Sequence, residues 1–102
     1  RVADESIVLL KNENILLPLN LNKIKSLAVI GPNANQVQFG DYTWSRSNKD
    51  GVTPLEGLKK RVGNKIKINY AAGCDLITDN KSGFDEAVAA VKASDCCICW
   101  FF

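Results

Sequence analysis

The sequence predicts an α/β fold, a three-layer sandwich with a mostly parallel sheet, and three observations support this. Segments with helical spacing alternate with short apolar runs along the 102 residues. The helical segments are about ten residues long, which suits crossover connections between parallel strands. The run "CCICWFF" is apolar on both faces, as in a strand covered on both sides. Because no helix follows to cover this run, we expect the domain to be incomplete.

Composition places the chain among ordinary globular proteins, with 46% apolar and 24% charged residues. The basic residues exceed the acidic ones by only two, and they are scattered along the chain. We therefore expect no nucleic-acid partner and no membrane partner. No apolar run reaches the roughly 18 residues that a membrane span needs. These features do not indicate a location for the protein.

The first elements expected are a helix and a buried strand. The stretch "RVADESIVLLKNE" has helical spacing and begins without a capping residue. Pro18 ends this pattern, and "SLAVIG" then predicts a buried strand over residues 27–30. The positions of the helical segment that share one face are Val2 or Ala3, Ile7 and Leu10.

The clearest helix signal is "TPLEGLKKRVG". Thr53 is the expected N-cap, Pro54 the first helical residue, and Glu56 the partner of Thr53 in a capping box. Gly63 is the expected stop. The apolar face consists of Leu55, Leu58 and Val62.

A second strand and a third helix follow. The stretch "KIKINY" alternates apolar and polar residues, which predicts a strand near a sheet edge. The stretch "SGFDEAVAAVKASD" predicts a helix opened by Ser82 with Asp85 three residues later, and it leads directly into a buried strand at residues 96–102. The expected inner face of this helix consists of Phe84, Ala87, Val88 and Val91.

The four cysteines are interpreted as structural thiols rather than as a disulfide or a metal site. Cys96, Cys97 and Cys99 share one apolar run, Cys74 stands apart, and the chain has no histidine. Asp75 has a spacing to Asp79 that resembles metal ligation, but a solvated loop is the better interpretation.

The stretch "GPNAN" after the first strand is not expected to bind a nucleotide. It lacks the further glycines of a phosphate-binding loop, and Pro32 removes a backbone donor. We therefore expect no cofactor and no metal in this chain.

The connection between Gly31 and Val52 has about 20 residues, where a strand-to-helix loop usually needs two to six. It follows the first strand, on the side of a parallel sheet where ligands bind. Within "GDYTWSRSNKDG", Tyr42 and Trp44 offer flat apolar faces suited to a sugar ring, and several polar residues offer hydrogen bonds. Alternatively, the two rings anchor the loop on its own domain. The polar residues are Asp41, Arg46, Asn48, Lys49 and Asp50.

Six stretches in order carry a family resemblance: "ESIVLLKNENILLPL", "IKSLAVIGPNAN", "FGDYTWS", "TPLEGLKKRVG", "YAAGCD" and "FDEAVAAVKASD". Together they resemble the start of the C-terminal α/β sandwich domain of glycoside hydrolase family 3. The resemblance covers residues 4–95 and is strongest to bacterial β-glucosidases and β-xylosidases. It implies that residues 1–102 are the N-terminal part of this domain, truncated at both ends.

The resemblance implies a retaining exo-β-glycosidase that hydrolyses O-glycosyl bonds of oligosaccharides in carbohydrate catabolism. This chemistry needs two carboxyl groups about 5 Å apart. In this family the nucleophilic Asp belongs to a preceding barrel domain, and the acid/base Glu lies further along the sandwich domain. We therefore assign no catalytic residue within residues 1–102 and expect the chain alone to be inactive. The missing barrel is its expected partner, and the family suggests a periplasmic or extracellular location.

The resemblance also implies that "GDYTW" lies at the mouth of the active site, between the two domains. We predict that Asp41, Tyr42 and Trp44 contact the substrate, with a seal against the barrel as the alternative. Two other interpretations of the chain remain: a free-standing carbohydrate-binding or interaction module, and an inactive gene remnant. The sequence does not choose between glucose and xylose.

The aromatic end of the chain departs from the family pattern. Where the family continues with small and branched apolar residues, this chain has Trp100, Phe101 and Phe102. This indicates either a divergent strand or a truncated gene or reading-frame error.

Overall fold

The computed structural model describes residues 1–44 and 48–101, so Arg46 and Phe102 lie outside the described residues. The described part contains a three-stranded parallel sheet with the order β2-β1-β3. Its strands are β1 (Ser26–Ile30), β2 (Lys67–Ala71) and β3 (Cys96–Cys99). The predicted position of "KIKINY" at a sheet edge is confirmed for this sheet.

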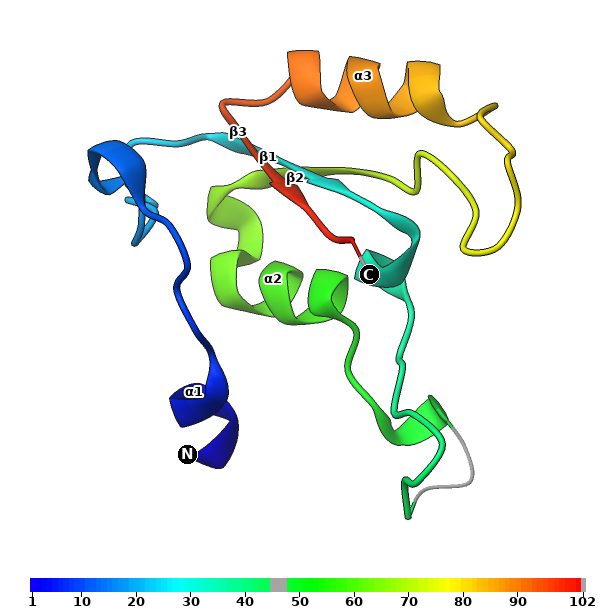
Figure 1. Ribbon diagram of the computed structural model, residues 1–102. Helices are drawn as coiled ribbons and strands as arrows, with labels where there is room; N and C mark the ends of the chain where they lie inside the picture. Colours follow the sequence, from blue (N-terminus) through cyan, green and yellow to red (C-terminus); the bar gives the residue numbers. More distant parts are fainter. Residues whose placement is uncertain (45–47, 102) are drawn as a thin grey trace.

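Two helices cover the two faces of the sheet. Figure 1 shows α2 (Pro54–Val62) on one face and α3 (Phe84–Lys92) on the other. The predicted three-layer α/β architecture with a parallel sheet is therefore confirmed.

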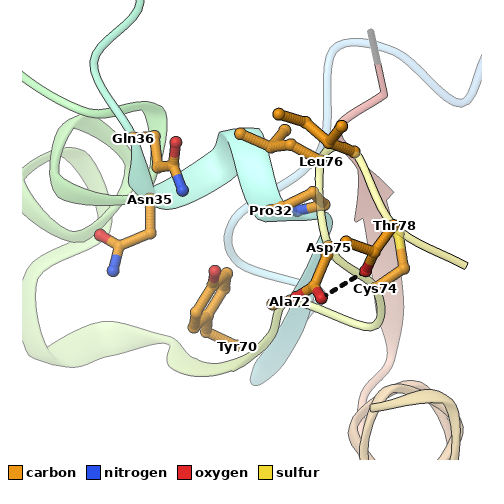
Figure 2. Close-up of a pocket in the computed structure, with 10 residues that line it drawn as sticks. Pro32, Asn35, Gln36, Tyr70, Ala72, Cys74, Asp75, Leu76 and Thr78 are labelled. Atoms are coloured by element: carbon orange, nitrogen blue, oxygen red, sulfur yellow. Dashed lines mark hydrogen bonds between the residues drawn. The ribbon is translucent and has the colours of Figure 1, made fainter. Parts of the chain in front are cut away.

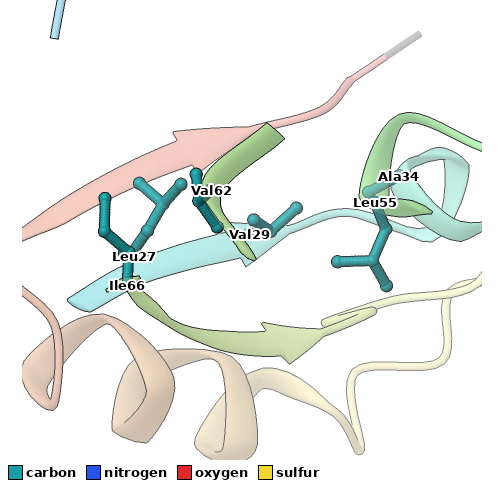
Figure 3. Packing of buried hydrophobic residues seen from close by; sticks show 6 residues of the cluster. All are labelled: Leu27, Val29, Ala34, Leu55, Val62 and Ile66. Carbon is teal, nitrogen blue, oxygen red and sulfur yellow. The ribbon is translucent and has the colours of Figure 1, made fainter. Parts of the chain in front are cut away.

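β1 is the central strand and supplies residues to two separate cores. Leu27 and Val29 pack on the α2 side with Leu55 and Val62, as Figure 3 shows. Ala28 and Ile30 pack on the α3 side, where Ala71 is their buried neighbour. Because side chains alternate along a strand, one short apolar run serves both faces.

The capping box of α2 is confirmed. The Thr53 hydroxyl accepts a hydrogen bond from the Glu56 N–H at 3.1 Å, and the Glu56 carboxylate accepts one from the Thr53 N–H at 2.9 Å. Gly63 ends the helix with a φ of 56°, which favours glycine.

The prediction of a long opening helix is wrong. The α-helix α1 (Val2–Ser6) is short, Ile7 follows it with an extended backbone, and a separate 3₁₀ turn forms at Glu13–Ile15. Ile7 and Leu10, predicted to share one face of this helix, lie beyond it and are exposed. Most helical stability comes from packing an apolar face against other elements, and α1 buries none of its residues.

The predicted start and inner face of α3 are also partly wrong. Its N-cap is Gly83 rather than Ser82, and no side chain caps it. Ala87 packs against the sheet as predicted, together with Ala90, whereas Phe84, Val88 and Val91 are exposed. The sheet residues on this side include two alanines, so the small residues of the helix make the contact.

The predicted strand at residues 96–102 is shorter and less buried than expected. β3 ends at Cys99, which is exposed, and Cys96–Ile98 are half-buried. β3 pairs with β1 from Leu27↔Cys96 to Ile30↔Cys99, so this run does form a strand.

Candidate functional site

The strand order places a topological switch point between β1 and β3. The chain runs from β1 to β2 on one side, and then through α3 to β3 on the other side of β1. Ligands of open parallel sheets bind outside the carboxyl ends of the strands at such a point. We therefore expect a ligand site among the residues that follow Ile30 and Cys99.

A cavity of about 700 Å³, here called the switch-point cavity, lies at this place. It combines apolar walls with side-chain amides from the loop after β1, and its volume falls within the range of ligand pockets. Its lining includes Asn33, Gln38, Phe39, Val52, Pro54 and Trp100.

Backbone contacts fix the ends of β1 and β3 beside this cavity. The Trp100 N–H donates to the Ile30 carbonyl at 2.7 Å. Gly31 has a φ of 123°, and a Cβ at this position would lie 2.1 Å from the Trp100 carbonyl oxygen. Only glycine permits both this φ and this close approach.

Side-chain amides form a polar strip on one wall of the cavity. Asn33 is buried in the short 3₁₀ helix Pro32–Asn35. The Gln38 amide donates to the Asn33 side-chain oxygen at 3.5 Å and to that of Gln36 at 3.2 Å. Amides both donate and accept hydrogen bonds, so this strip can pair with the hydroxyl groups of a ligand.

Figure 2 shows the residues that line a second cavity, of about 410 Å³. It adjoins the first, since Gln36 and Leu76 line both. Tyr70 at the end of β2 also lines it. Burial raises the pKa of Tyr70, and the charge of Glu86 adds to this, so the phenol remains a hydrogen-bond donor at neutral pH. The Asp75 carboxylate accepts a hydrogen bond from the Thr78 hydroxyl at 2.7 Å, within the loop after β2.

The predicted site residues lie on the loop beside the switch-point cavity but line neither cavity. Tyr42 and Trp44 are fully exposed, at 105% and 100%, and Asp41 is exposed as well. Neither ring therefore packs on the part of the domain that the structure describes, and both roles of the rings stay predictions.

The base of this loop is closed by close packing. A Cβ at Gly51 would lie 2.3 Å from Val37 Cγ1 and 2.8 Å from the Phe39 ring. Gly40, directly before the exposed tip, lines the switch-point cavity. The tip at residues 41–44 therefore begins at the cavity and extends into solvent.

Sequence reasoning missed Asn33, Gln38 and Trp100. Asn33 and Gln38 lie in the long loop after β1, but the aromatic residues of that loop are the ones that suggest ligand binding. Trp100 departs from the family pattern and carries no local signal of a site. The signal that could have found all three is the strand order, since it brings the segments after β1 and β3 together.

Across residues 1–44 and 48–101, no three His, Cys, Asp or Glu side chains gather where they could hold a metal ion. The four cysteines, all within this part, are free thiols. In the same residues, no helix has the length and apolar character needed to cross a bilayer.

Comparison with known families shows to which family the chain belongs. The sequence profile of the Glycosyl hydrolase family 3 C-terminal domain matches residues 7–101. The chain belongs to glycosyl hydrolase family 3. The family resemblance carried by the six stretches is thus confirmed, and the matched region includes Trp100 and Phe101.

Relatives with both expected activities occur in this family. The chain is 50% identical over 100 residues to a β-xylosidase of Formosa agariphila, covering 92% of this chain and 14% of that protein. It is 41% identical over 92 residues to the probable β-D-xylosidase 6 of Arabidopsis thaliana, covering 89% and 11%. It is 33% identical over 105 residues to the lysosomal β glucosidase of Dictyostelium discoideum, covering 91% and 13%.

A solved structure shows the same fold. A GH3 exo-β-xylosidase, in complex with a xylobiose aziridine activity-based probe, matches with a TM-score of 0.67 and 37% identity. The match covers 82% of this chain and 10% of that one. The chain therefore spans about a seventh or less of the length of these glycoside hydrolases.

Proposed function

We propose that this chain is the first part of the C-terminal domain of a β-xylosidase or β-glucosidase, and that it forms one wall of the substrate site. Family membership and the names of the relatives support this proposal. The relatives include both xylosidases and a glucosidase, so the proposal extends to β-linked xylose and glucose in oligosaccharides. The nucleophile and the acid/base belong to other parts of the enzyme, with the retaining mechanism expected for the family.

The exposure of Tyr42 and Trp44 is the observation that carries this proposal. Large aromatic rings normally bury much of their surface, yet neither ring packs on the described part of this domain. Their loop begins at a cavity whose walls carry side-chain amides. The rings offer stacking surfaces for a sugar, the Asp41 carboxylate lies on the same loop, and the amides lie at the cavity where the loop begins.

A chimera tests the proposal. Residues 7–101 replace the matching segment of the Formosa agariphila β-xylosidase, and hydrolysis of an aryl β-xyloside is measured. The chimera is expected to be active, and Trp44→Ala within it is expected to raise KM about tenfold, the effect of losing roughly 1.4 kcal/mol of binding. Phe84→Ala, at an exposed residue of α3 that lines neither cavity, is the matched control and should leave KM unchanged. A folded but inactive chimera would contradict the proposal.

Contact with the barrel domain is a second candidate for the loop, favoured by the same exposure. In that case Trp44→Ala lowers the melting temperature of the chimera and leaves KM unchanged.

The chain alone is expected to release no sugar from aryl glycosides. Calorimetric titration of the chain with xylobiose and cellobiose tests the alternative of a free-standing binding module, which requires measurable heat without the barrel.

A further inference from the structure

Two of the four cysteines lie side by side on one face of β3. The sulfur atoms of Cys97 and Cys99 are 3.6 Å apart. Cys97 packs with the core on the α3 side, whereas Cys96 packs with the core on the α2 side. Alternate residues of a strand point to the same face, so Cys96 points away from the other two.

Within the described residues, this pair of thiols is accessible. Cys99 is exposed and Cys97 is half-buried. The neighbours of Cys97 in the α3-side core are mostly small, and they include Ala28, Ala87 and Ala90. Burial, with a further contribution from Cys99, raises the pKa of Cys97 to about 11, so this thiol is protonated at neutral pH. Both cysteines are free thiols, and a small reagent can reach them from the solvent side.

The distance between the sulfurs suits one shared atom better than a disulfide. Two steps along a strand separate Cα atoms by about 6.4–6.8 Å, the upper limit for a disulfide. Two bonds of about 2.3 Å, the length of a zinc–sulfur bond, would join sulfurs 3.6 Å apart at an angle of about 103°. This bent geometry fits a pyramidal or tetrahedral centre and excludes a linear one.

We propose that Cys97 and Cys99 form a dithiol site that binds a trivalent arsenical through both sulfurs. With an arsenic oxide R–As=O, two As–S bonds form and the As=O bond breaks. The two thiol protons leave with the oxygen as water, and no oxidation state changes. The site is independent of the proposed glycosidase function, and it lies directly before Trp100 at the switch-point cavity.

The test is a titration of the reduced chain with phenylarsine oxide. Intact mass gives the stoichiometry, and the fluorescence of Trp100 gives the affinity in a Trp44→Phe background, where it is the remaining tryptophan. One equivalent is expected to bind. Cys99→Ser, at an exposed position, should weaken binding about 100-fold or more because the second attachment is lost. Cys74→Ser and Cys96→Ser should bind like the parent.

The denatured chain distinguishes a folded site from a merely cysteine-rich sequence. In the folded Cys97→Ser variant, Cys96 and Cys99 point to opposite faces and cannot share one arsenic atom, so binding is lost. In guanidinium chloride the same variant should recover binding through these two thiols. Circular dichroism confirms that each variant is folded. Tight binding by the folded Cys97→Ser variant, or its loss in Cys96→Ser, would overturn the proposal.

Discussion

The two helices that sandwich the sheet are equally long but are held in different ways. α2 and α3 each have nine residues and an apolar face. α2 buries Leu55 and Val62 and carries a capping box, whereas α3 buries no residue fully and has no side-chain cap. The difference arises from the sheet, which offers Leu27 and Val29 to α2 but mainly small residues to α3. An apolar stripe therefore indicates a helix without indicating how much of it the neighbouring sheet can cover.

Matched truncations should show the largest difference between the two helices. Leu55→Ala removes a side chain that is 3% exposed and should lower the free energy of unfolding by about 2–5 kcal/mol. Val88→Ala, at a residue that is 51% exposed, should change it by less than about 0.5 kcal/mol. Urea denaturation measures both, and equal losses would contradict the comparison.

The glycines of the two helices should respond in opposite directions. Gly83→Ser supplies a better N-cap, but its Cβ would lie 2.8 Å from the Gly73 carbonyl oxygen, so we expect a loss of about 1–3 kcal/mol. Gly57 in α2 has no atom within 4 Å of such a Cβ, so Gly57→Ala should stabilise by about 1 kcal/mol. Thermal unfolding measures both variants. If Gly83→Ser were stabilised, the backbone at Gly73 would be able to move away from the new Cβ.

Removing the hydroxyl groups of the two expected caps, Thr53 and Ser82, should again affect the stability of the two helices differently. Thr53→Ala breaks the capping box of α2 and should cost about 1 kcal/mol. Ser82→Ala should have almost no effect, because Ser82 does not cap α3. The midpoint of urea denaturation measures both variants, provided that the dependence of the unfolding free energy on urea concentration is unchanged. If Ser82→Ala destabilised the fold as much as Thr53→Ala, Ser82 would cap α3 as the sequence predicts.

The smallest effect is expected at Asp95, which joins the end of the α3 segment to β1. The backbone N–H of Lys25, followed by the hydroxyl and N–H of Ser26, lowers the pKa of Asp95. A lowered pKa stabilises the fold at pH values above the ordinary pKa of 3.8, and this stabilisation is lost as the pH falls through the folded value. Asp95→Asn should remove this part of the acid dependence. Urea midpoints between pH 2 and pH 6 measure it, and identical profiles for the variant and the parent would contradict it.

The parts of the fold that could be predicted are those with local signals. Thr53, Glu56 and Gly63 specify α2 from within its own segment, so its start and end were correct. The N-cap of α3 depends on Gly73, and its inner face depends on Ala28, both distant in sequence. These contacts are not visible until the chain is folded.

The same distinction applies to the candidate site. The length of the loop between Gly31 and Val52 marked it as functional, and the exposure of Tyr42 and Trp44 agrees with a role in binding. The switch-point cavity depends on β3 pairing beside β1, and no local pattern encodes that order. Trp100 could therefore not be assigned to the site from its sequence neighbours alone.

The central position of β1 also sets the order in which the sheet can be completed during synthesis. Lys67 in β2 is synthesised 41 residues after its partner Ser26 (67 minus 26), and Cys96 follows its partner Leu27 after a longer interval. At roughly 5–20 residues per second, a ribosome needs about 2–8 s for the first interval alone. During that time the most apolar strand has two open edges. Within this segment, β1 is therefore open to misassembly until β2 emerges, and a chaperone that binds apolar strands would be useful in that interval.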